Sequence, residues 1–145
     1  MTDTVQSRAL LICDSAFQQA GTNEWHIIGV FNQILVRELP ATHTPFVVFC
    51  SLAHFAGEAV VMATIRDNAG DVVTSVRAHF PRLPPQAFDF AFPFPPVTFQ
   101  KTGSHVLELH VAEELLAVRS FGVQFAAGLT PGGSPSGPAL QPPKA

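Results

Sequence analysis

Short runs of β-branched and aromatic residues, each ended by Gly, Pro, Asn or Asp, repeat along this chain from Arg8 to about Phe125. A helix would need apolar residues every three or four positions over ten or more residues, and that spacing is hard to find. The 145 residues suffice for one domain with a core. We therefore expect an all-β protein, an antiparallel β-sandwich of immunoglobulin-like or similar type with about eight strands.

The apolar runs in the first half of the chain predict three strands. Residues 9–13 form the first, and residues 25–36 form a long second strand bent at Gly29, since a glycine inside a strand often marks a bend or bulge. Residues 39–45 contain two prolines and are expected to be a loop. Residues 46–55 are apolar on both faces, which is typical of a central strand covered on both sides, or of one that faces a partner.

Two hairpins are predicted in the second half. Residues 59–66 and 72–80 flank a turn at 67–71 (DNAGD), where Asn and Gly accept the backbone angles of a tight connection. Residues 105–111 and 115–125 form the second hairpin around a three-residue turn. The sandwich is expected to occupy residues 1–127, and the Gly-, Pro- and Ser-rich residues 128–145 to form a flexible, disordered tail.

A stripe of four phenylalanines occupies alternate positions from Phe88 to Phe94, so an extended strand places them all on one face. The prolines that follow predict a short strand or a sheet edge. The chain has 13 Phe, one Trp and no Tyr, and Phe packs as a pure hydrophobe, so the stripe is either core or an exposed patch for a partner. The possible interface residues comprise this stripe and two residues of the apolar strand before it: Phe46, Val48, Phe88, Phe90, Phe92 and Phe94.

Charge is sparse in this sequence. The net charge is −3, which leaves no basic surface for phosphates, so a nucleic-acid partner is not expected. Only 13% of the residues are charged, about half of the ~25% in typical soluble domains, and a surface this neutral favours association with a protein partner or with a second copy.

No motif predicts a catalytic residue, a cofactor or a metal. The six histidines lack H-x-H or H-x-x-x-H spacing, and the oxygens of Asp67, Asn68 and Asp71 are better explained by a turn than by a calcium site. Asp14-Ser15 has no G-x-S-x-G context, and no phosphate-binding glycine loop occurs.

The first eight residues lack the pattern of a secretory signal, and no apolar run reaches the ~18 residues of a membrane span. Cys13 and Cys50 have no C-x-x-C spacing and are expected to be free core thiols. These features predict a soluble, cytoplasmic protein.

Several segments resemble an uncharacterised family of small bacterial β-sandwich proteins. The matching segments are ALLICDSA at 9–16, IIGVFNQI at 27–34, Pro40-Ala41, the turn at 67–70, Phe92-Pro93-Phe94 before Gly103, and EELLA at 113–117. The resemblance spans residues 8–125 and implies a β-sandwich without an assigned activity. Asn32 stands where an acid is common in that family.

Taken together, these features favour a non-catalytic structural or interaction module that self-associates or docks on a protein partner, with an unprotected strand edge as one mode. The alternative is a small-ligand binder with a pocket between the sheets or at one end, near Trp25, His26 and His43. An enzyme of unknown type is the third possible function.

Overall fold

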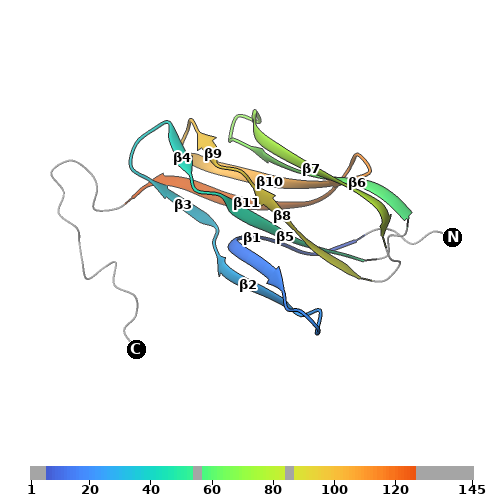
Figure 1. The fold of residues 1–145 in the computed structure, drawn as a ribbon. Coiled ribbons are helices and arrows are strands. Elements are labelled where there is room, and N and C mark those ends of the chain that lie inside the picture. The colour runs from blue at the N-terminus through green and yellow to red at the C-terminus, as the bar shows by residue number, and fades with distance from the viewer. Residues whose placement is uncertain (1–5, 54–56, 84–86, 127–145) are drawn as a thin grey trace.

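In a computed structural model, which describes residues 6–53, 57–83 and 87–126, the chain forms two β-sheets packed face to face (Figure 1). One sheet has the strand order β2-β1-β5-β8, the other has β3-β11-β10-β6-β7, and β4 pairs with β9 in a small third sheet. The strands are β1 (Gln6–Gln18), β2 (Trp25–Val30), β3 (Gln33–Val36), β4 (Ala41–His43), β5 (Phe46–Ala53), β6 (Gly57–Arg66), β7 (Val72–Leu83), β8 (Phe88–Phe94), β9 (Val97–Phe99), β10 (Gly103–Val111) and β11 (Glu114–Phe125). This arrangement is the expected all-β sandwich of two packed sheets.

The described residues contain strands and turns but no helix, and therefore no helix of the length and apolarity needed to cross a membrane. Residues 127–145, which include the predicted tail, lie outside the described part of the chain.

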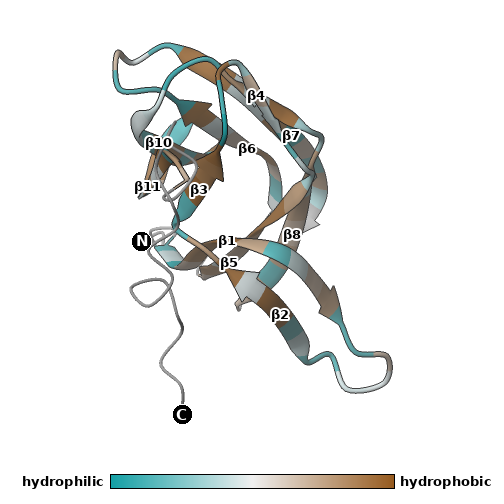
Figure 2. Ribbon diagram, turned by 90° about the vertical axis from the view of Figure 1, so that its left-hand side faces the viewer, coloured by the Kyte–Doolittle hydropathy of each residue, from teal (hydrophilic) through white to brown (hydrophobic). Residues whose placement is uncertain are grey.

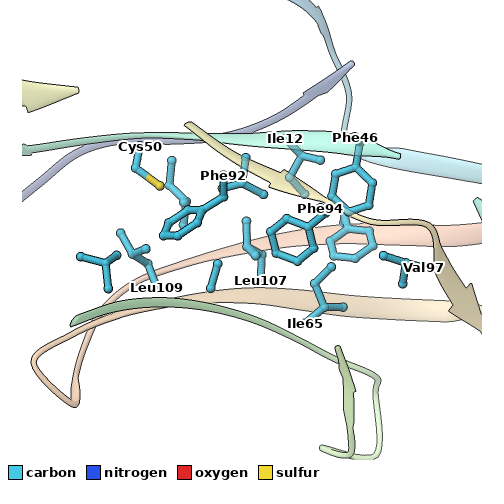
Figure 3. Packing of buried hydrophobic residues seen from close by; sticks show 14 of the residues in the cluster. Ile12, Phe46, Cys50, Ile65, Phe92, Phe94, Val97, Leu107 and Leu109 are labelled. Atoms are coloured by element: carbon cyan, nitrogen blue, oxygen red, sulfur yellow. The ribbon is translucent and has the colours of Figure 1, made fainter. Parts of the chain in front are cut away.

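The core lies between the two sheets, because alternate residues of each strand point inward. Figure 3 shows Phe46, Phe92 and Phe94 of one sheet facing residues such as Leu107 and Ile65 of the other. The rings of Phe46 and Phe94 stack at 5.1 Å between centroids. As predicted, β5 is a central strand buried on both faces: its inner face joins the core, and Phe49 on its outer face meets the Trp25 ring at 5.3 Å.

The predicted long strand over residues 25–36 is wrong. Its first half is β2, which pairs with β1, and its second half is β3, which pairs in parallel with β11 of the opposite sheet. The residues between the halves bridge the sheets: the Phe31 amide donates to the Ile12 carbonyl (2.9 Å), and the Asn32 carbonyl accepts from Gly122 (3.0 Å). The chain therefore changes sheets where a continuous strand was expected.

The two predicted hairpins are confirmed as β6–β7 and β10–β11. Ala112 and Glu113 adopt positive φ angles of 52° and 71°, as a two-residue hairpin turn with the twist of the flanking strands requires. The strand count is eleven rather than about eight, partly because the segment expected to be a loop at 39–45 contains β4.

Candidate interaction surface

A hairpin formed by the end of β1 and all of β2 extends outward from the two packed sheets (Figure 2). Three of its large apolar side chains are exposed to solvent: Phe17 by 49%, Ile28 by 53% and Val30 by 49%. Phe17 lies opposite His26, and their rings stack at 5.1 Å. Ile28 is two residues from His26 and shares its face of the strand. We call Phe17, Ile28 and Val30 the hairpin patch.

The opposite face of the hairpin attaches it to the sandwich. Trp25 packs edge-on against Phe49 of β5, and Ile27 and Ala16 are half-buried. Gly29 has a φ of 71°, and a Cβ there would overlap the carboxylate of Asp14 on the neighbouring strand. This position therefore needs glycine both for its backbone angle and for the space that Asp14 fills.

The free edge of β2 carries no protection against pairing with another strand. β2 is the outermost strand of its sheet, and its sequence WHIIGV contains no proline, lysine or acidic residue. Edge strands commonly avoid association by carrying such residues. The opposite edge of this sheet differs, because β8 carries Asp89 and Pro93.

Five of the six possible interface residues predicted from the sequence are core residues in this structure. Phe46, Val48, Phe90, Phe92 and Phe94 are all buried between the sheets, where no partner can reach them. Phe88 is half-buried at the edge, with its ring 5.4 Å from those of Phe80 and Phe90. Their strands were identified, but the second sheet covers the face on which these side chains lie.

The residues considered for metal or ligand binding are not brought together. His26 bonds Gln19 Oε1 (2.8 Å), His79 bonds Glu58 (2.6 Å) and His43 bonds the Thr44 carbonyl (2.7 Å). Trp25 contacts Phe49, whereas the ring of His43 lies against Phe31 and Phe46. Within the described residues, no three His, Cys, Asp or Glu side chains are grouped to hold a metal ion.

The Asp67 carboxylate serves the turn between β6 and β7. Its Oδ1 accepts the amides of Ala69 (2.9 Å) and Asp71 (3.0 Å), and Oδ2 lies 3.4 Å from Lys101 Nζ. The pKa of Asp67 is lowered: loss of hydration raises it, but the two amides and Lys101 together outweigh that effect.

Both cysteines are free and buried. Cys13 lies on the outer face of its sheet, where burial and the nearby Asp14 charge raise its pKa, and burial in the core raises the pKa of Cys50 to about 12. Both thiols are therefore protonated at neutral pH and poor nucleophiles.

The sequence did not predict the hairpin patch, because one continuous strand over residues 25–36 would lie within the sandwich. A signal was present: Ile27 and Ile28 are adjacent and apolar, so in any strand one of them faces away from the core.

Three solved structures show low similarity to this chain. An alkylpurine DNA glycosylase from Pseudomonas fluorescens, solved bound to DNA, is 13% identical with a TM-score of 0.47, over 83% of this chain and 30% of the glycosylase. An immunoglobulin-like protein from Pseudomonas aeruginosa is 15% identical with a TM-score of 0.39, over 84% and 98% of the two chains. A β-glucosidase from Listeria innocua, in complex with glucose, is 9% identical with a TM-score of 0.45, over 83% and 16%.

This chain thus spans less than a third of the glycosylase and about a sixth of the glucosidase. No curated protein gives a significant sequence match. One family profile covers most of the sandwich, from within β1 to within β11, at residues 8–124. The chain therefore belongs to a family of unknown function, DUF6941.

Proposed function

We propose that this protein is a non-catalytic interaction module that self-associates through the β1–β2 hairpin. The observation that carries the proposal is the hairpin patch, three large apolar side chains about half exposed on one projecting element. Several exposed large apolar side chains on one element commonly mark an interaction site. Two free thiols, with no disulfide between the described cysteines, support a reducing compartment such as the cytoplasm.

A second copy is the occupant that the hairpin favours. Strand β2 contains no charged side chain, so two copies of it can approach without like-charge repulsion. Its unpaired edge can form an antiparallel pair with the same edge of another copy, which would create one continuous sheet and bring two hairpin patches together.

Light scattering behind a sizing column tests this proposal. The full chain is expected to show a concentration-dependent mass of at least twice the 15.6 kDa of one copy. The double variant Phe17→Ser, Ile28→Ser should remain a folded monomer. The control is Leu115→Ser, Val118→Ser on β11, where both side chains are about as exposed but lie outside the hairpin. A monomeric wild type, or equal dissociation by both double variants, would refute the proposal.

A second candidate, small-ligand binding, is favoured by one buried histidine at the end of the sandwich. His105 is 1% exposed and lies between the rings of Phe99 and Phe121. Its Nδ1 donates to the Gly103 carbonyl (3.0 Å), which leaves the lone pair on Nε2. His105 lines a pocket of about 530 Å³ whose rim includes Asp67 and Lys101.

Such a pocket suits a small molecule with a hydrogen-bond donor for Nε2. A thermal-shift screen of small amines and alcohols tests this candidate. A melting shift that His105→Phe abolishes would support it, whereas the absence of any shift would remove it.

A further inference from the structure

Two strand edges face each other across one side of the sandwich without a strand between them. Among the described residues, β1 from Gln6 to Ile12 pairs only with β5, and β11 from Glu114 to Phe121 pairs only with β10. The bridge at residues 31–32, described above, closes one end of the gap. A groove of about 690 Å³ lies between the edges, lined by residues 6–10 and 116–119.

The groove is positively charged although the chain is negative overall. Its two charged residues are Arg8 and Arg119, and its lining contains no acidic residue. Within the described part of the chain, neither arginine forms an ion pair. Arg8 is exposed at a bulge in the β1–β5 pairing, between Ser7 and Ala9, and bulges commonly redirect a side chain.

Arg119 lies on the core-facing side of β11 and reaches across the groove. Its Nη1 donates to the Leu10 carbonyl of β1 (3.3 Å), so this carbonyl points into the groove. Its Nε is buried and has no hydrogen-bond partner among the described residues. A buried donor on a charged group without a partner costs free energy, and a carboxylate is the acceptor that best removes this cost.

We propose that this groove binds an extended acidic segment of a partner protein as an added β-strand. Free strand edges recognise an extended peptide through its backbone, and pockets or charges between them select its side chains. The edge formed by residues 6–10 of β1 is about 16 Å long, so it can pair with about five residues of an extended segment. A Glu or Asp of the segment pairs with the Arg119 guanidinium, and Arg8 adds a second positive charge. This site is separate from the hairpin patch and does not depend on self-association.

Fluorescence anisotropy with the full chain tests the proposal. The probe is the fluorescein-labelled peptide Ser-Thr-Val-Glu-Val-Thr-Ser, and its matched control carries Gln in place of Glu. The Glu peptide is expected to bind saturably and at least about tenfold more tightly than the Gln peptide, because its carboxylate forms an ion pair with the arginine, whereas the Gln amide offers only a neutral acceptor. Arg119→Gln should abolish this preference. Arg77→Gln, a change at an exposed arginine on the outer face of β7, should keep it.

Hydrogen exchange locates the bound peptide independently of the variants. The Glu peptide should slow exchange of backbone amides in residues 6–10 and 116–119. Should Arg119→Gln fail to fold, Arg8→Gln provides a second variant at an exposed position, with a smaller expected loss of affinity. The proposal is overturned by an absence of saturable binding, by equal affinity for the Glu and Gln peptides, or by protection confined to other strands.

Discussion

The β1–β2 and β6–β7 hairpins are both rich in β-branched residues, but only the β6–β7 hairpin has a face covered by the opposite sheet. Strand β6 is paired on both sides, by β7 and β10, and its inward residues are sealed by the opposite sheet. Strand β2 is paired only with β1, and the outer face of its hairpin has no sheet opposite. Burial in this protein is therefore set by what lies across from a hairpin, not by the hairpin's own composition.

Among the tests of this comparison, Ile65→Ala in β6 is expected to have the largest effect. Ile65 is fully buried, so truncation removes apolar contact and leaves a cavity between the sheets. We expect a loss of about 2–5 kcal/mol in the free energy of unfolding, measured by chemical denaturation. A loss below about 1 kcal/mol would show that this part of the core is loosely packed.

Gly29→Ala tests whether the other hairpin depends on its own backbone geometry. Alanine at a φ of 71° costs about 1–3 kcal/mol, and its Cβ also collides with Asp14. Trp25 is the single tryptophan and packs on Phe49, so its emission should shift to the red as the hairpin detaches. Adding Asp14→Ala to Gly29→Ala should reverse only part of the red shift in Trp25 emission, because the strained backbone angle remains. An emission spectrum that Gly29→Ala leaves unchanged would contradict the claim that this position requires glycine.

Asp67→Asn probes the turn of the β6–β7 hairpin through pH. Because the folded-state pKa of Asp67 lies below its ordinary value of 3.8, its ionised form stabilises the fold. That contribution is present above pH 3.8 and is lost as the pH falls through the lowered pKa. We expect Asp67→Asn to lower the melting temperature slightly at neutral pH. At low pH, the melting temperatures of the wild type and the variant should converge. If the difference in melting temperature stays constant down to pH 2, the effect does not come from ionisation of Asp67.

Ile28→Ala has the smallest expected effect on folding and completes a matched pair with Ile65→Ala. Since Ile28 is 53% exposed, its truncation should change the free energy of unfolding by less than about 0.5 kcal/mol. The same variant should weaken self-association in light scattering. A destabilisation as large as that of Ile65→Ala would mean that the hairpin patch is covered within one copy.

Much of the architecture was readable from the sequence because it is encoded locally. Period-two alternation identified the Phe88 to Phe94 strand, the prolines predicted that it is short or at an edge, and Asn-x-Gly in the 67–71 segment identified the β6–β7 turn. The central position of β5 followed from a run that is apolar on both faces. The glycine at position 29 predicted a bend, and its φ is 71°, but the change of sheet at residues 31–32 was not predicted.

The candidate sites were not predictable in this way. Sequence reasoning proposed Phe46 and Phe94 as interface residues, whereas Phe17, Ile28 and the groove beside Arg119 were not identified. A side chain's exposure depends on which strands pair and which faces meet, and these contacts join residues far apart in the chain. Arg119 and Leu10, for example, are 109 positions apart.

By itself, the sequence determined that this chain forms strands, where most of its turns lie and that its surface is sparsely charged, because these properties depend on neighbouring residues and on composition. The tertiary structure decided which phenylalanines are core, where the chain changes sheets and which strand edges stay unpaired. The physical reason is that a strand's own residues do not decide which other segment will cover each face or pair with each edge, and packing against the rest of the chain does.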